Sequence, residues 1–227
     1  MNGTMESFCL IEKACVVRCP TGTGPWPVAY LCGGDMSEQI AQFAVDGVQF
    51  LLVSANADWE RDYTPWPAPA LPGRAPFTGE AEGYLHFLTE VLKPYIDANY
   101  PVLTDSKHTA LMGYSLGGLF ALWAAFQTPV FGMSASLSGS LWYQGWLDYA
   151  RFHCFQSSNV YLSLGKSEEQ GGSPLMRTVG DCTRETAAVL EKQLGSGSVF
   201  LEWNRGGHFT GIPNRWKKAL QWLSPLF

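Results

Sequence analysis

Residues 109–126 read Thr-Ala-Leu-Met-Gly-Tyr-Ser-Leu-Gly-Gly-Leu-Phe-Ala-Leu-Trp-Ala-Ala-Phe, and the order of elements in this stretch decides the fold class. Thr109–Met112 is a short apolar run typical of a buried strand, and Leu116–Gln127 is a strongly helix-forming run. Between them, Gly113-Tyr-Ser115-Leu-Gly117 matches the pattern G-x-S-x-G. A strand, a glycine-rich turn and a helix in this order predict a nucleophile elbow, in which a serine stands on a sharp turn at the edge of a sheet.

The residues of the turn suit this geometry. Gly113 and Gly117 lack the Cβ atoms that would collide where a strand and a helix pack closely. Ser115 would stand at the N-terminus of the helix, where backbone N–H groups and the helix dipole favour negative charge. The N–H of Leu116 is therefore a candidate donor to an oxyanion. The alternative is an ordinary strand-to-helix turn in which Ser115 only caps the helix.

Strand-like and helix-like segments alternate along the rest of the chain. Further strands are expected at Val28–Cys32, Val48–Ser54, Met133–Leu137, Val160–Leu164 and Val199–Trp203, with antiparallel edge strands within Phe8–Val17. Further helices are expected at Ser37–Val45, Glu80–Asn99, Thr183–Leu194 and Asn214–Leu223. This alternation predicts an α/β fold with a mostly parallel central sheet in a three-layer sandwich, built as a single domain over residues 1–227.

Two stretches interrupt the alternation. Asp58–Phe77 contains five prolines, which exclude a helix through that run, and its aromatic residues indicate an ordered segment. It is expected to be either a surface crossover or a binding loop beside the site. Ser138–Gln156 is rich in aromatic residues, Trp142 among them, and would either pack into the core or cap the site.

A serine hydroxyl needs a base to become a nucleophile, and the chain has four histidines. His208 follows the last expected strand in Arg205-Gly-Gly-His208, which places it on a loop at the carboxyl end of the sheet, where α/β proteins build their sites. The other three occupy a helix pattern, the wrong end of a strand and an irregular aromatic segment: His86, His108 and His153. His208 is therefore the candidate base; the alternative is a solvated loop residue.

The third member of a catalytic triad is an acid that orients the imidazole. The order serine, acid, histidine places it between positions 116 and 207, after the strand before the last one. That strand, Val160–Leu164, is followed by Gly-Lys-Ser-Glu168-Glu169. Glu168 is the first choice, followed by Glu169 and then by Asp148 or Asp181. The alternatives are an exposed acidic loop and a site that works without an acid.

A second oxyanion donor is expected on the loop after an early strand. The segment Tyr30-Leu-Cys-Gly33-Gly34-Asp35-Met36 supplies it, because glycines let backbone amides approach a substrate closely. The N–H of Gly34, Asp35 or Met36 is the candidate donor, and a plain glycine turn is the alternative.

Composition limits the classes of function. With 46% hydrophobic residues the 227-residue chain can bury a full core, and its net charge of −5 gives no basic surface for nucleic acid. We expect neither a membrane span nor a secretory signal, because no apolar stretch has the required length and flanks. The six cysteines lack the spacing of a zinc site, so we expect reduced, mostly buried thiols in a cytoplasmic protein, with no metal and no other cofactor.

Five segments together resemble the putative esterase family of α/β hydrolases, and within it the enterochelin (siderophore) esterase branch. They span nearly the whole chain in the family's order: Tyr30–Asp35, Arg61–Trp66, Gly113–Leu119, Ser138–Tyr143 and Gly207-His208. The second segment, Arg-Asp-Tyr-Thr-Pro-Trp, and the fourth, Ser-Gly-Ser-Leu-Trp-Tyr, are far more specific than G-x-S-x-G.

The resemblance implies the α/β-hydrolase fold and hydrolysis of small-molecule carboxylic esters through an acyl-serine intermediate, with Ser115 as nucleophile and His208 as base. It also implies that Arg61 helps to bind an anionic or catechol-bearing substrate, and Trp142 is the second candidate for a substrate contact. Two other functions stay open at this point. One is transfer of the acyl group to an acceptor other than water, and the other is non-catalytic binding on a hydrolase fold.

Overall fold

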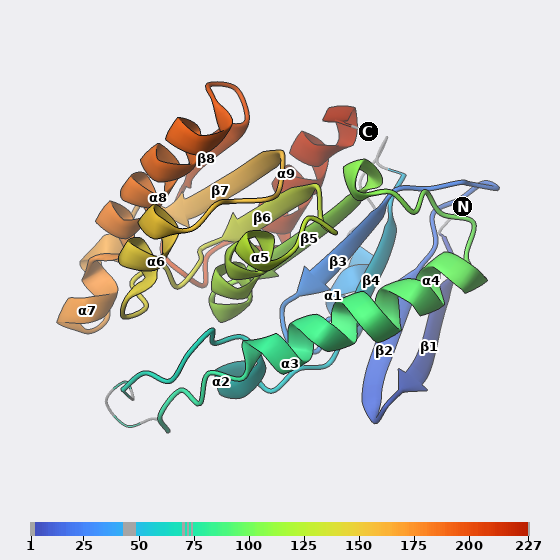
Figure 1. Cartoon of the computed structure of the whole chain (residues 1–227), viewed down its shortest axis with the longest axis horizontal. Helices are drawn as coiled ribbons and strands as arrows, with labels where there is room; N and C mark the ends of the chain where they lie inside the picture. The colour runs from blue at the N-terminus through green and yellow to red at the C-terminus, as the bar shows by residue number, and fades with distance from the viewer. Residues whose placement is uncertain (1–2, 43–48, 70, 72, 74, 227) are drawn as a thin grey trace.

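The computed structural model describes residues 3–42, 49–69, 71, 73 and 75–226 (Figure 1). Within them, eight strands form one sheet in the order β1-β2-β4-β3-β5-β6-β7-β8. The strands are β1 (Met5–Leu10), β2 (Lys13–Arg18), β3 (Val28–Cys32), β4 (Leu51–Ala55), β5 (Thr109–Tyr114), β6 (Met133–Leu137), β7 (Asn159–Gly165) and β8 (Val199–Asn204).

The α-helices are α1 (Ser37–Gln42), α2 (Trp59–Asp62), α3 (Ala81–His86), α4 (Lys93–Asn99), α5 (Leu116–Gln127), α6 (Trp146–Phe152), α7 (Pro174–Arg177), α8 (Val179–Leu194) and α9 (Ile212–Leu223). A π-helical segment, η1 (Phe87–Leu92), joins α3 to α4. Three short 3₁₀ helices complete the list: η2 (Ser106–His108), η3 (Glu168–Gln170) and η4 (Ser224–Leu226).

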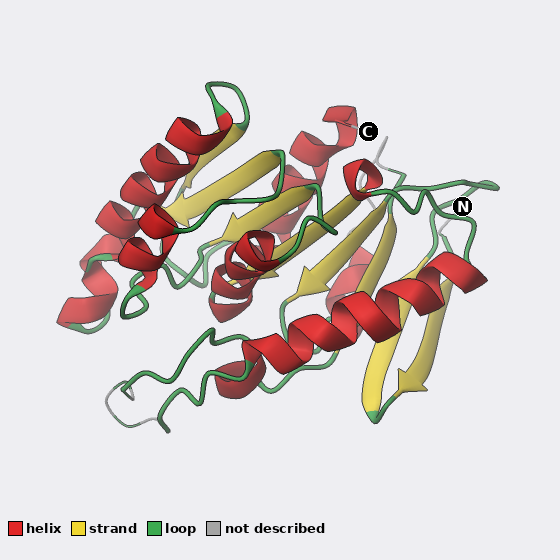
Figure 2. Cartoon of the chain, viewed as in Figure 1, coloured by secondary structure: helices red, strands yellow, loops and turns green. Residues whose placement is uncertain are grey.

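The sheet is mostly parallel. β1 and β2 form an antiparallel hairpin that joins β4 in antiparallel fashion, and all pairings from β4 to β8 are parallel. The carboxyl ends of the parallel strands therefore share one edge, as the arrowheads in Figure 2 make visible. Helices α3 to α6 and α8 cover one face, whereas α1 and α9 cover the other (Figure 1). The predicted α/β fold, with its central sheet in a three-layer sandwich, is confirmed.

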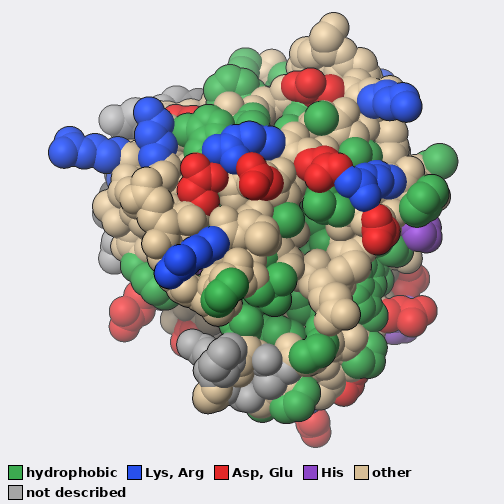
Figure 3. Space-filling model, turned by 90° about the vertical axis from the view of Figure 1, so that its left-hand side faces the viewer, with side chains coloured by type: hydrophobic (Ala, Val, Ile, Leu, Met, Phe, Trp, Pro, Cys, Tyr) green, Lys and Arg blue, Asp and Glu red, His purple; other side chains and the backbone are tan. Residues whose placement is uncertain are grey.

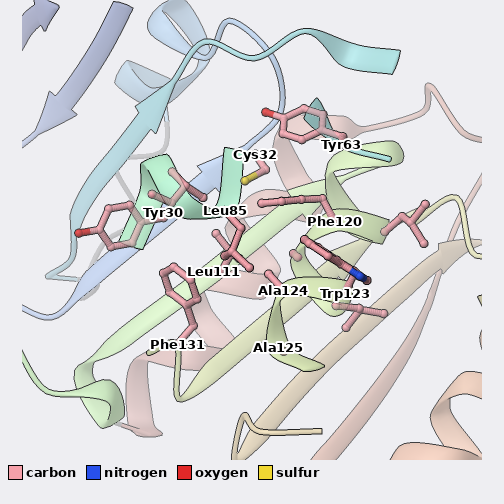
Figure 4. Packing of buried hydrophobic residues seen from close by; sticks show 14 of the residues in the cluster. Tyr30, Cys32, Tyr63, Leu85, Leu111, Phe120, Trp123, Ala124, Ala125 and Phe131 are labelled. Atoms are coloured by element: carbon pink, nitrogen blue, oxygen red, sulfur yellow. The ribbon is translucent and has the colours of Figure 1, made fainter. Parts of the chain in front are cut away.

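The larger hydrophobic core is built around α5. All residues of Leu116–Phe126 are buried, so this helix is apolar on every side, as suits a helix at the centre of a core. Figure 4 shows its Phe120 beside Tyr63, and their ring centroids are 5.6 Å apart. A second core packs Trp216 of α9 against the opposite face of the sheet. Because α5 is enclosed, the residue that precedes it, Ser115, is fixed relative to the strand ends.

Most expected elements are confirmed, with differences at their ends. The helix expected at Glu80–Asn99 is a helical run over residues 81–99, but its middle is π-helical. The helix expected from Thr183 begins earlier, at Val179. The expected helix end at Val45 and strand start at Val48 lie outside the described residues.

The two interrupting stretches hold more helix than expected. Within Asp58–Phe77, α2 forms ahead of the prolines because the Asp58 side chain accepts a hydrogen bond from the Arg61 N–H at 3.0 Å and caps the helix. Ser138–Gln156 contains α6, and most of its aromatic side chains pack into the core: Trp142, Tyr143 and Trp146 are buried. The aromatic residues of this second stretch are therefore mainly structural.

Candidate active site

Ser115 stands on a strained turn between β5 and α5. Its φ of 57° and ψ of −119° are rare for a residue that has a side chain. The turn leaves no room for further atoms, since a Cβ on Gly113 would lie 1.9 Å from the Gly117 carbonyl oxygen and a Cβ on Gly117 would lie 2.0 Å from that of Cys32. Both glycines are therefore required by close packing, and the serine starts the helix as a nucleophile elbow demands.

Three side chains from separate segments meet at the carboxyl edge of the sheet. His208 Nε2 lies 3.1 Å from Ser115 Oγ, and His208 Nδ1 lies 2.7 Å from Glu168 Oε2. Glu168 opens η3 after β7, and His208 lies on the loop after β8. Because β5, β7 and β8 run parallel, the segments that follow them converge at one edge. The structure thus brings together the three residues that the sequence singled out first.

The Glu168 carboxylate is buried and has a hydrogen-bond donor at each oxygen. Oε1 accepts from Gly165 N–H at 2.7 Å, from Ser138 Oγ at 2.8 Å and from Arg215 Nη1 at 2.7 Å, while Oε2 faces His208. Burial alone would raise the pKa of this carboxyl, but the hydrogen bond to His208 and the attraction of a protonated imidazole, together with the hydrogen bonds from Arg215 and Gly165, outweigh burial and hold the pKa below its ordinary value. Glu168 is therefore ionised, which is the form that orients an imidazole.

The other acids considered from the sequence lie away from His208. Glu169 and Asp181 pair with Arg184 at 3.1 Å and 2.8 Å, and Asp148 pairs with an arginine of its own helix at 2.9 Å. Glu169 follows Glu168 directly, yet consecutive residues of a 3₁₀ helix point in different directions, so Glu169 faces α8.

The two loops proposed to supply oxyanion donors lie next to each other. Strand register aligns Cys32 of β3 with Gly113 of β5, so residues 33–35 leave the sheet beside residues 114–116. The Leu116 N–H, in the first turn of α5, donates no hydrogen bond within the described part of the chain. The Gly34 N–H makes a long hydrogen bond of 3.4 Å to the Tyr63 hydroxyl, and the Asp35 carboxylate accepts from Ser37 N–H at 3.0 Å.

Arg61 and Trp142 have different surroundings. The Arg61 Nε lies 2.8 Å from Asp62 Oδ1 and 3.9 Å from Glu80 Oε2, and the side chain is 45% exposed. Arg61 also lines a hollow of about 500 Å³ together with Lys13 and other residues of the β1–β2 hairpin. Trp142 is 8% exposed, with its ring 6.4 Å from that of Phe77. Among the described residues, the recorded hydrogen bonds, ion pairs and ring contacts of Arg61 and Trp142 involve other partners than the three meeting side chains, so their contact with a substrate stays a prediction.

Sequence reasoning gave no role to several residues that contact Ser115, His208 or Glu168. Arg215 bonds to Glu168, the Tyr114 hydroxyl donates to the His208 carbonyl, and Ser140 Oγ lies 3.4 Å from Ser115 Oγ. The sequence did contain a signal for Arg215. It lies in the buried stripe of α9, whose other members are apolar: Trp216, Ala219, Leu220 and Leu223.

Other features of the described residues bear on chemistry elsewhere in the chain. They contain no group of three His, Cys, Asp or Glu side chains arranged to hold a metal ion. None of their helices combines the length and apolar character that crossing a membrane requires. All six cysteines are free; Cys15, Cys19 and Cys32 are buried, whereas Cys9 and Cys154 are exposed. The expectation of mostly buried thiols therefore holds for only half of them.

Comparison with known proteins agrees with this fold. The chain is 29% identical to the uncharacterized protein YbbA of Bacillus subtilis over 169 residues, which are 71% of this chain and 68% of YbbA. It is 32% identical to the ferri-bacillibactin esterase BesA of Bacillus subtilis over 180 residues, which are 71% of this chain and 60% of BesA. The solved structure of the siderophore hydrolase EstA from Aspergillus nidulans superposes with a TM-score of 0.76 over 99% of this chain and 95% of EstA, at 18% identity.

A family model matches most of the chain. The model described as "Putative esterase" matches residues 21–208, a span that begins before β3 and ends at His208. It therefore includes all three side chains that meet at the carboxyl edge. The chain belongs to the putative esterase family, a family of carboxylic ester hydrolases.

Proposed function

We propose that this chain hydrolyses carboxylic esters through an acyl-serine intermediate, with Ser115 as nucleophile, His208 as general base and Glu168 as the acid that orients the imidazole. The observation that carries the proposal is the continuous hydrogen-bonded series from Ser115 Oγ to His208 Nε2 at 3.1 Å and from His208 Nδ1 to Glu168 Oε2 at 2.7 Å. A serine, a base and an orienting acid in this arrangement activate a hydroxyl that is otherwise a weak nucleophile.

The geometry supports the following sequence of proton transfers. Ser115 Oγ attacks the ester carbonyl while His208 Nε2 takes its proton, and the imidazolium then protonates the leaving alkoxide. A water molecule next attacks the acyl-serine with the same base, which regenerates the serine hydroxyl and releases the carboxylic acid. The ionised Glu168 holds His208 with its Nδ1–H toward the acid and stabilises the imidazolium at each step.

We propose the Leu116 N–H as one donor to the oxyanion and the N–H of Gly34 or Asp35 as the other. The position of Leu116 in the first turn of α5 supports this role, because the first N–H groups of a helix have no partner within it. The aligned ends of β3 and β5 support the second donor. Each such donor is worth about 3–4 kcal/mol in transition-state stabilisation.

For the substrate we propose a siderophore-type or other ester with an aromatic acyl group. Two observations support this class. One relative is named a ferri-bacillibactin esterase, and Phe209, beside the proposed base, is 85% exposed with its ring centroid 4.9 Å from that of His208. Figure 3 views the molecule from the side toward which the parallel strands run, and hydrophobic side chains cover much of the lower part of this face. Arg61, which is partly exposed, is a further candidate for contact with an anionic substrate.

The cytoplasmic location expected from the cysteines stays a prediction.

A labelling experiment and a substrate panel test the proposal. The purified chain is treated with a fluorophosphonate probe and assayed with short p-nitrophenyl esters, feruloyl esters and ferric enterobactin. We expect labelling at Ser115 and a loss of about 10⁵–10⁶-fold in kcat for Ser115→Ala. Ser106→Ala is the matched control, because Ser106 is exposed and precedes β5 at the opposite edge of the sheet. Absence of labelling in folded protein, or unchanged hydrolysis by Ser115→Ala, would contradict the proposal.

A further inference from the structure

Arg215 is a buried cation in a helix that otherwise presents apolar side chains to the sheet. It lies one turn into α9 and is 1% exposed. A charge at such a position is costly unless it is paired and hydrogen-bonded, so its partners indicate why it is there. An apolar residue would complete the buried stripe of α9 at lower cost.

The partners of Arg215 come from four segments that meet at the candidate active site. Nη1 lies 2.7 Å from Glu168 Oε1 and 3.2 Å from the Tyr114 hydroxyl, and it also bonds to Ser138 Oγ. Nη2 donates to the Gly207 carbonyl at 2.7 Å. These residues follow or end β5, β6, β7 and β8, so one guanidinium links the ends of four neighbouring strands.

The contacts around the Arg215 guanidinium hold both the proposed acid, Glu168, and the backbone of the proposed base, His208. Arg215 and Ser138 occupy Glu168 Oε1, which leaves Oε2 for His208 and fixes the plane of the carboxylate. On the other side, Arg215 holds the carbonyl of Gly207, and the Tyr114 hydroxyl donates to the carbonyl of His208 itself. The backbone that carries the imidazole is therefore held by the same guanidinium that holds the carboxylate.

We propose that Arg215 is a positioning residue for catalysis: it sets the orientation of Glu168 and the place of the His208 backbone, and it does not touch the substrate. This inference rests on the proposed serine esterase function. The planar guanidinium suits the task, because it reaches Glu168 and Gly207 with separate nitrogens, which a lysine ammonium cannot do with the same geometry.

The charged groups around Glu168 and His208 mean that the proposal can be tested by the pH dependence of kcat/KM. Glu168 is faced by His208 from the loop after β8 and by Arg215 from α9, while Tyr114 of β5 and Tyr161 of β7 lie within range of Arg215. Burial raises the pKa of both tyrosines, so they stay neutral through the assay range. Without Arg215, the Glu168 carboxyl loses a hydrogen bond that lowers its pKa, so it binds a proton at higher pH. The acid limb of kcat/KM then moves to higher pH.

The experiment compares Arg215→Met with Lys218→Met, which removes a cation of the same helix that pairs with Glu202 instead. Rates on p-nitrophenyl acetate are expressed per folded molecule, with the folded fraction taken from thermal unfolding followed by circular dichroism. We expect Arg215→Met to lower kcat about 100-fold and to raise the midpoint of the acid limb by about one pH unit. Lys218→Met should change neither quantity.

A double variant separates positioning from a general effect on the fold. The part of the Arg215 effect that runs through Glu168 is already lost in Glu168→Gln, so adding Arg215→Met to that variant should lower kcat by clearly less than the 100-fold seen in the wild-type background. Should Arg215→Met fail to fold, Arg215→Lys keeps the charge and should still lower kcat on the order of tenfold with the acid limb in place. Wild-type kcat in Arg215→Met or Arg215→Lys, or losses that multiply in the double variant, would overturn the proposal.

The two proposals fail in different ways. If the wild-type chain is not labelled by a fluorophosphonate or Ser115→Ala retains hydrolysis, the serine esterase function itself is wrong. If the wild-type chain is labelled and active while Arg215→Met keeps the wild-type kcat and pH profile, only the role of Arg215 is wrong.

Discussion

Replacement of Glu168 by glutamine is the most informative single change, because it preserves shape and removes one charge. The carboxylate accepts hydrogen bonds from Gly165, Ser138 and Arg215 at Oε1 and faces His208 at Oε2. An amide has an oxygen at only one of these positions. Its NH₂ group must therefore face a donor on one side, toward either the imidazole or the guanidinium.

The size of the effect follows from this geometry. Turning the amide nitrogen toward His208 disfavours the tautomer with Nδ1–H, and for a triad acid this change lowers kcat on the order of 10³–10⁴-fold. The glutamine also leaves the Arg215 cation buried without its counter-charge, which costs about 3–5 kcal/mol. For a chain of this length each kcal/mol shifts Tm by about 2–4 °C, so we expect Tm to fall by about 6–20 °C at pH 7.

The stability difference should depend on pH with a definite sign. The pKa of Glu168 lies below its ordinary value in the folded protein, so its stabilising contribution is present above the pKa of the unfolded chain and is lost as pH falls through the folded pKa. A protonated Glu168 resembles glutamine. The Tm gap between the wild type and Glu168→Gln should therefore be widest near neutral pH and should narrow below about pH 4.

Glu169→Gln is the matched control for both measurements. Glu169 is the next residue of the same 3₁₀ helix, and it pairs with Arg184 at 3.1 Å near the surface. Such a pair contributes less than about 1 kcal/mol, so Tm should change little and kcat should stay at the wild-type value. Wild-type kcat in Glu168→Gln, greater damage from Glu169→Gln, or an equal Tm gap for Glu168→Gln at about pH 3 and at pH 7 would refute this prediction.

Two further predictions concern packing and thiol chemistry. Gly113→Ala should lower Tm by about 2–12 °C and reduce activity, because its Cβ would overlap the Gly117 carbonyl and overpacking costs about 1–3 kcal/mol. Gly83→Ala in α3, whose Cβ meets open space, should instead raise Tm slightly, as thermal unfolding of both variants will show. At pH 8, iodoacetamide should modify the exposed Cys154 quickly and spare Cys15, since burial raises the pKa of the Cys15 thiol to about 11; equal rates by mass spectrometry would contradict this.

The sequence predicted those parts of the molecule that depend on neighbours along the chain. The elbow at Ser115 could be predicted because the strand, the two glycines and the helix that determine it are contiguous. His208 could be located because a loop after the last strand must end at the carboxyl edge of a parallel sheet. The choice of Glu168 over Glu169 was less secure, since adjacent residues of one type differ only in the directions that η3 gives them.

Contacts between distant segments could not be predicted in the same way. Arg215 lies 47 residues from Glu168 and 101 residues from Tyr114, and nothing in a local pattern fixes which buried groups face each other across a sheet edge. The π-helical turn of η1 is similar, because periodicity over residues 81–99 predicts a helix without specifying its hydrogen-bonding pattern. Trp142 shows the same limit, since an aromatic residue in an irregular segment suits both a core and a pocket.

Hydrogen bonds to neighbouring strands of the sheet hold the strained backbone at the site. Ser115 and Ser138, at the ends of the neighbouring strands β5 and β6, both have positive φ, a conformation that costs about 1–3 kcal/mol for such residues. The Ser115 N–H donates to the Leu137 carbonyl at 3.0 Å, and the Ser138 N–H donates to the Ser163 carbonyl at 2.7 Å. Each strained serine is thus tied to the next strand of the sheet. Relaxing either serine would break the hydrogen bond that ties it to the next strand, so we expect the Ser115 hydroxyl and the Ser138 donor to Glu168 to keep their places when a substrate binds.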